Sequence, residues 1–141
     1  MPSSNWNILF VDDSKTEINY LKLLFQLTDI PLIPNFINSA HQAIETLEKL
    51  GKDEFPDIVV VDINMPLMDG FEFAKIYAEK FSAKHTKTRL FIYSTSIHSA
   101  DINRAEMMSG VSGFIAKPFD DSTFKDHIYP HLPENKELQI N

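Results

Sequence analysis

Two kinds of hydrophobic pattern alternate along this chain. Short, continuous apolar runs rich in β-branched and aromatic residues are typical of strands that are buried on both faces of a parallel sheet. Five such runs are expected, at residues 6–11, 33–38, 58–61, 90–93 and 112–116. After each run, apolar residues recur every three or four positions, which is the period of an amphipathic helix. The alternation predicts a doubly wound α/β domain, a five-stranded parallel sheet with helices on both faces.

Five helices are expected to follow the strands, at about 14–29, 39–50, 69–81, 99–109 and 120–129. Capping signals mark several of their ends. Asp69 precedes Glu72 by three positions, which is the spacing of a capping box at the start of the third helix. Gly51 and Gly110 follow the second and fourth helices, where a residue in the left-handed conformation commonly ends a helix.

Composition and charge narrow the class of protein. The length of 141 residues suits one domain, which we place at residues 6–131, with tails at 1–5 and 132–141 and no room for a second domain. The absence of cysteine excludes disulfides and thiolate chemistry and fits a cytoplasmic location. No apolar run is long enough to span a membrane, and the formal net charge of −7 argues against a nucleic-acid surface.

Polar residues follow four of the predicted strands. The first strand ends in Asp12 and Asp13, the third in Asp62, the fourth in Thr95 and the fifth in Lys117. Each residue alone has an ordinary structural explanation as a helix cap, a turn residue or a solvated cation. Because the carboxyl ends of parallel strands meet at one edge of a sheet, we expect these groups to converge there. Their convergence is what indicates a functional site.

The chemistry of such a site follows from its charges. Carboxylates a few ångströms apart repel each other by about 4 kcal/mol per pair at an effective dielectric constant of about 20. They are stable together only if a cation binds or some of them take up protons. An all-oxygen donor set without cysteine or histidine suits Mg²⁺, which readily shares a phosphate ligand. The lysine and the hydroxyl add partners for phosphoryl oxygens, so the sequence predicts a phosphoryl group beside Mg²⁺ with a carboxylate as nucleophile.

These residues resemble those of the receiver domains of two-component response regulators, the CheY-like family. The resemblance covers residues 7–129 and includes the acidic pair, the DxNMPxMDG segment around Asp62, Thr95, and Lys117-Pro118. It implies a flavodoxin-like strand order of 2-1-3-4-5. It also implies a single-domain phosphorelay protein that catalyses only its own phosphorylation and dephosphorylation.

The resemblance implies a role for each residue at the predicted site. Asp62 would be the phosphoacceptor. Asp13 and Asp62 would bind Mg²⁺ directly with the backbone carbonyl of Asn64, and Asp12 would act through water. Lys117 would pair with the phosphoryl oxygens.

A conformational switch is implied as well. Thr95 would hydrogen-bond the phosphoryl group, and Phe114 would follow it from an exposed to a buried position. Ser94 and Ser96 are neighbouring hydroxyls; we choose Thr95 because the strand pattern ends at Ser94 and the spacing matches the family. The peptide bond before Pro118 would be cis, which X-Pro bonds can adopt at small cost.

The expected partners are a histidine kinase or phosphotransfer protein and a downstream effector protein, with no nucleic acid and no membrane. The surface of the fourth helix, fifth strand and fifth helix would change on phosphorylation and bind the effector. The resemblance to the family also suggests a homodimer through this surface. Two rival functions remain. A haloacid-dehalogenase-like phosphohydrolase would need an acid where this chain has Asn64, and a flavin carrier would place its phosphate against the repelling Asp12 and Asp13.

Overall fold

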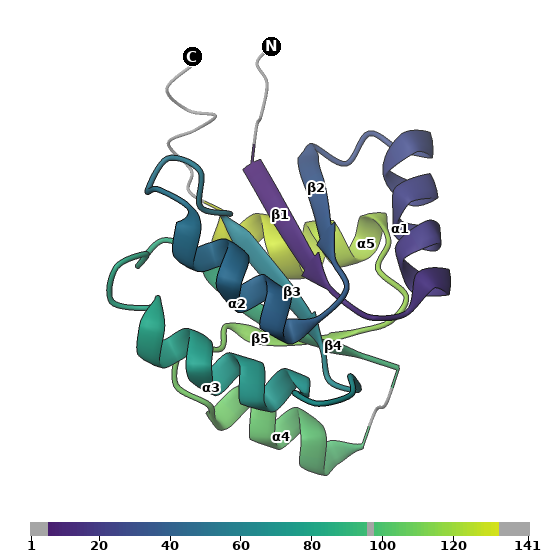
Figure 1. Ribbon diagram of the computed structural model, residues 1–141. Coiled ribbons are helices and arrows are strands. Elements are labelled where there is room, and N and C mark those ends of the chain that lie inside the picture. Colours follow the sequence, from purple (N-terminus) through teal and green to yellow (C-terminus); the bar gives the residue numbers. More distant parts are fainter. Residues whose placement is uncertain (1–5, 96–97, 133–141) are drawn as a thin grey trace.

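The computed structural model describes residues 6–95 and 98–132 and contains a parallel sheet between two layers of helices (Figure 1). The strands are β1 (Trp6–Val11), β2 (Leu32–Ile37), β3 (Ile58–Asp62), β4 (Arg89–Ser94) and β5 (Gly113–Ala116). They lie in the order β2-β1-β3-β4-β5, and every pair of neighbours is parallel. The predicted doubly wound α/β fold and its flavodoxin-like strand order are therefore confirmed.

Helices cover both faces of the sheet (Figure 1). One face carries α1 (Lys15–Leu27) and α5 (Asp121–Thr123), and the other carries α2 (Ala40–Lys49), α3 (Gly70–Lys80) and α4 (Ser99–Met107). The last predicted helix is irregular, because α5 passes into a π-helical turn and then into a 3-10 turn that contains Pro130, which has no N–H to donate. Among the described helices, none has the length and apolar character needed to span a bilayer.

Alternate residues of the central strand serve two separate hydrophobic cores. Val59 and Val61 pack with α2, α3 and α4, whereas Ile58 and Val60 pack with α1 and the C-terminal segment. Every residue of β3 is buried, which explains why the strand is apolar from Ile58 to Val61, up to its last residue, Asp62. Leu132, which we assigned to the C-terminal tail, belongs to the second core, so the packed structure extends one residue beyond 131.

The predicted helix ends are partly confirmed. Asp69 and Glu72 form the expected capping box at the start of α3, and Gly110 has a left-handed φ of 87° after α4. The expectation for Gly51 is wrong, because its φ is not positive. Leu50 ends α2 instead, in an extended conformation with its N–H bonded back into the helix.

Candidate functional site

The polar residues at the strand ends come together at the carboxyl edge of the sheet. Asp12 follows β1 and Asp62 ends β3, and they are only 1% and 5% exposed. The neighbouring Asp13 is exposed. One oxygen from each of these carboxylates lies within 4.8 Å of the other two. The sheet thus assembles the acidic cluster from residues far apart in the chain.

Lys117, which follows β5, lies against this cluster. Its Nζ is 2.9 Å from Asp12 Oδ2 and 3.0 Å from Asp62 Oδ1. Burial would lower the pKa of Lys117, but hydrogen bonds and the charges of Asp12 and Asp62 together raise that pKa above its ordinary value. The lysine is therefore charged at neutral pH and compensates part of the acidic charge.

The carboxyl group of Asp62 lies in a buried environment that disfavours its charged form. Burial and, after it, the charge of Asp12 raise its pKa, and Lys117 opposes them, so that the pKa stands at about 6 instead of the ordinary 3.8. The group is ionised at neutral pH, so an oxygen is available as a nucleophile. The remaining negative charge is what a bound cation would relieve.

The donor set fits Mg²⁺. All the side chains are carboxylates, the hard oxygen ligands that this ion prefers. Two of them are buried and Asp13 is exposed, so part of a coordination shell would face solvent, and Mg²⁺ usually keeps several waters. Within residues 6–95 and 98–132, no other group of three acidic, histidine or cysteine side chains is arranged in this way.

Two backbone positions shape the loop between β3 and α3. The Gly70 N–H donates to the Ile63 carbonyl over 2.9 Å, and a Cβ at position 70 would lie only 2.5 Å from the Asp62 carbonyl oxygen. Only glycine lets α3 begin so close to the end of β3. Leu67 is different, because it has a left-handed φ of 71° and a side chain that is 92% exposed. A leucine in this conformation is strained.

Replacing Leu67 by asparagine is expected to stabilise the protein by about 0.5–1 kcal/mol, because asparagine tolerates the left-handed conformation better. The exposed leucine side chain loses little packing when it is removed. The measurement is the urea midpoint of unfolding. Leu27→Asn is the control, since Leu27 is also exposed but lies in the helix α1. A midpoint for Leu67→Asn at or below that of the wild type would contradict the prediction.

The remaining predicted residues lie on β4, on β5 and directly after these two strands. Thr95 directly follows β4 and is exposed, whereas Ser94 is the buried last residue of that strand; Ser96 lies outside the described residues. Phe114 on β5 is half-buried and packs against the core beneath α2, α3 and α4. The peptide bond between Lys117 and Pro118 is cis. Of Ser94 and Thr95, Thr95 is the exposed residue and Ser94 the buried one.

Sequence reasoning missed a layer of tyrosine hydrogen bonds behind the site. Tyr93 pairs with Asp62 in the register of β3 and β4 and is 1% exposed. Its hydroxyl donates to Glu17 and accepts the N–H of Phe119 over 3.1 Å. The hydroxyl of Tyr20 donates to the Phe119 carbonyl over 2.6 Å. Strand periodicity could place Tyr93 in the interior, but no pattern indicated what its hydroxyl would bind.

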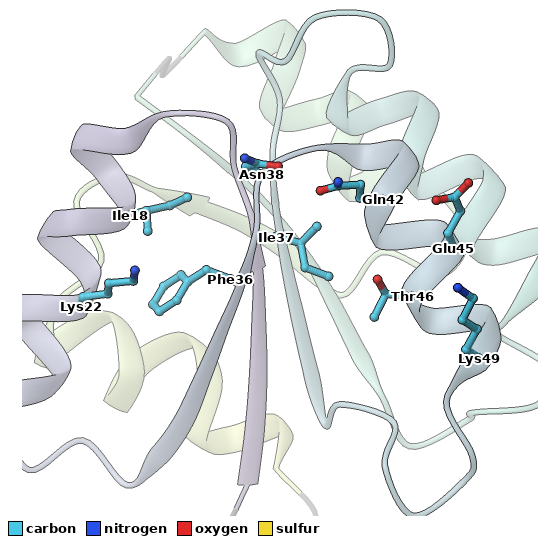
Figure 2. Close-up of a pocket in the computed structure, with 9 residues that line it drawn as sticks. All are labelled: Ile18, Lys22, Phe36, Ile37, Asn38, Gln42, Glu45, Thr46 and Lys49. Carbon is cyan, nitrogen blue, oxygen red and sulfur yellow. The ribbon is translucent and has the colours of Figure 1, made fainter.

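A separate hollow of about 570 Å³ lies along the edge strand β2, between α1 and α2 (Figure 2). Its lining residues are Ile18, Lys22, Phe36, Ile37, Asn38, Gln42, Glu45, Thr46 and Lys49. Figure 2 shows the side chains of α1 and α2 on opposite sides of this strand. The lining holds one carboxylate and no histidine, so the acidic cluster remains the candidate site.

Comparison with known proteins agrees with this site. The sequence model of the response regulator receiver domain matches residues 8–129. CheY of Halobacterium salinarum is 30% identical over 125 residues, which cover 86% of this chain and 92% of that protein. CheY-3 of Vibrio cholerae is 33% identical over 126 residues, which cover 89% of this chain and 91% of that protein.

Solved structures and longer relatives complete the comparison. A response regulator receiver protein from Dyadobacter fermentans has a TM-score of 0.75 at 28% identity, covering 89% of this chain and 97% of its own. A response regulator from Cytophaga hutchinsonii has a TM-score of 0.79 at 22% identity, covering 89% of this chain and 94% of its own, and shows the shared fold. The chain spans only 7% of hybrid signal transduction histidine kinase E of Dictyostelium discoideum, at 29% identity. It spans 28% of the transcriptional regulatory protein FlgR of Helicobacter pylori, at 34% identity.

The family match decides against the phosphohydrolase and flavin-carrier interpretations. Receiver domains are signalling modules rather than conventional enzymes; they interact with histidine kinases and bind Mg²⁺ at an acidic cluster such as the one formed by Asp12, Asp13 and Asp62. This chain belongs to the response regulator receiver family and is a CheY-like receiver domain of two-component signalling.

Proposed function

We propose that Asp62 accepts a phosphoryl group from a phosphohistidine on a histidine kinase or a phosphotransfer protein. The observation that carries the proposal is the position of Lys117, whose Nζ lies 2.9 Å from Asp12 and 3.0 Å from Asp62. An ammonium group beside the nucleophile can bind a phosphoryl oxygen and stabilise the charge that develops during transfer. The buried, ionised Asp62 supplies the attacking oxygen.

The transfer is a single displacement at phosphorus. An oxygen of Asp62 attacks the phosphorus atom, the bond from phosphorus to the histidine nitrogen breaks, and the nitrogen keeps the bonding electrons. The product is an acyl phosphate on Asp62. Asp13, Asp62 and the backbone carbonyl of the exposed Asn64 would hold Mg²⁺ directly, with Asp12 acting through water. Bound Mg²⁺ would neutralise phosphoryl charge and help to align the reacting groups.

The phosphoryl group then acts as a switch, because it adds negative charge and acceptor oxygens at Asp62. Thr95, exposed at the end of β4, turns its hydroxyl toward the new acceptor, and the half-buried Phe114 moves inward behind it. The surface of α4, β5 and α5 changes with them and binds a downstream effector protein or a second copy of this chain. The net charge of −7 favours a protein partner over a nucleic acid.

Acetyl phosphate tests the proposal without a kinase. The protein is incubated with it in Mg²⁺ or in EDTA, and the intact mass is recorded. We expect a hydroxylamine-labile gain of one phosphoryl group that requires Mg²⁺ and is absent from Asp62→Asn. Asp69→Asn is the matched control, since it changes a carboxylate of the same loop that caps α3, and asparagine also caps well. No adduct on the wild type, or an undiminished adduct on Asp62→Asn, would refute the assignment.

A further inference from the structure

The segment that follows Lys117 is held by two phenol groups. The N–H of Phe119 donates to the hydroxyl of Tyr93 over 3.1 Å, and its carbonyl accepts from the hydroxyl of Tyr20 over 2.6 Å. On the other side, the backbone N–H of Lys117 donates to the Ser94 carbonyl over 2.9 Å. The backbone that carries Lys117 is thus fixed both before and after the cis peptide bond.

Tyr93 also contacts Lys117 through its ring, because the Nζ of Lys117 lies 5.0 Å from the ring centroid. Packing does not explain why this ring has a hydroxyl. Its aromatic neighbours, Phe10 at 6.3 Å and Phe119 at 6.5 Å, are phenylalanines, and phenylalanine would fill the same space. A buried hydroxyl is unfavourable unless it is hydrogen-bonded, so its two hydrogen bonds are the feature to be explained.

Those hydrogen bonds belong to a network that connects Tyr93 with the acidic cluster at both ends. The amide of Ser14 donates to Asp12 Oδ1 over 2.9 Å, and the hydroxyl of Ser14 accepts the N–H of Glu17 over 3.2 Å. Glu17 accepts a hydrogen bond from the hydroxyl of Tyr93, and this hydroxyl accepts the N–H of Phe119 in the loop after Lys117. The Nζ of Lys117 in turn donates to Asp12 Oδ2 over 2.9 Å. Such a network fixes its members more firmly than separate bonds would. It sets the position of the lysine relative to the acidic cluster.

We infer that Tyr93, oriented by Glu17, is a positioning residue for phosphoryl transfer, whose hydroxyl fixes the loop of Lys117 so that Nζ stays between Asp12 and Asp62. The inference rests on the proposed phosphorylation of Asp62. Lysine has a long stem with several freely rotating bonds, so the place of its ammonium group depends on the backbone and on the walls around it. Tyr93 supplies both, a wall through its ring and a backbone anchor through its hydroxyl.

The rate of phosphorylation by acetyl phosphate at saturating Mg²⁺ tests the inference. Tyr93→Phe keeps the ring and removes the hydroxyl. We expect its rate of phosphorylation to fall about tenfold, which corresponds to the free energy of one buried hydrogen bond. Tyr77→Phe is the matched control. Tyr77 is equally buried on the other face of the sheet, where its hydroxyl lies near Thr88 and takes no part in the hydrogen bonds around Lys117. Its rate should equal that of the wild type.

Two variants of Glu17 provide an independent comparison, because this half-buried side chain can be changed without altering the core. Glu17→Gln retains an oxygen that accepts from Tyr93, and its rate should stay close to that of the wild type. Glu17→Ala loses the acceptor, and its rate should fall as that of Tyr93→Phe does. This pair decides the question even if Tyr93→Phe does not fold.

A double-mutant cycle separates positioning from a general structural effect. If Tyr93 acts through Lys117, Tyr93→Phe should cause no further loss of rate in a Lys117→Met background. An undiminished tenfold loss in that background would overturn the inference, as would a wild-type rate for Tyr93→Phe or for Glu17→Ala. In those cases the wild-type adduct would still support phosphorylation of Asp62. No adduct on the wild type would refute both proposals together.

Discussion

Replacing Gly70 by alanine is expected to destabilise the fold by about 3 kcal/mol, at the upper end of the cost of overpacking. The added Cβ would lie 2.5 Å from the Asp62 carbonyl oxygen and 2.9 Å from the Ile63 Cα. Both are backbone atoms of the β3 end, which is locked between neighbouring strands, so neither can move aside cheaply. The small gain in helix propensity of alanine over glycine does not offset this clash. Urea unfolding measures the loss.

Gly113→Ala is the matched control for this prediction. A Cβ at Gly113 would meet only the ring of Phe91, at 3.5 Å, which is ordinary contact. We expect its stability to stay within about 0.5 kcal/mol of the wild type. Since the clash at Gly70 displaces Asp62, Gly70→Ala should also lose most of its phosphorylation by acetyl phosphate. Equal stability of the two alanine variants would show that α3 can shift away from β3.

Asp62→Asn is expected to stabilise the metal-free protein by about 2–3 kcal/mol at pH 7, which corresponds to a pKa raised from 3.8 to about 6. The sign follows from proton binding. Between these two pKa values the folded state binds a proton at Asp62 more tightly than the unfolded state does. The wild type therefore loses stability as the pH rises through this window, and above about pH 6 the whole penalty is present.

The measurement is the free energy of unfolding in EDTA from pH 4 to pH 8 for both proteins. Their difference should shrink as the pH falls to 4, because the folded state then binds a proton at Asp62 and the pH approaches the ordinary pKa of 3.8. Asp13→Asn is the control, because that carboxylate is exposed and its removal should change stability little. Addition of Mg²⁺ at pH 7 should stabilise the wild type and not Asp62→Asn. A difference that grows on acidification would contradict the raised pKa of Asp62.

The sequence by itself determined the elements and the place of the site. Apolar runs of strand length and helices with one apolar face are local properties, so the element order and most boundaries follow from periodicity. The convergence of Asp12, Asp13, Asp62 and Lys117 also follows, because parallel strands present their carboxyl ends at one edge. The strand order came from the resemblance to receiver domains, since periodicity does not state which strands are neighbours.

Tertiary structure alone decided the contacts on which the chemistry depends. Lys117 and Asp12 are 105 positions apart, and only the packed sheet brings Nζ to within 2.9 Å of the carboxylate. The raised pKa of Asp62 likewise comes mainly from burial, which no local pattern measures. The hydroxyl of Tyr93 and the left-handed Leu67 were missed for the same reason: hydrogen-bond partners and backbone strain depend on atoms that other elements supply. Local sequence sets which groups are present, and packing sets their distances.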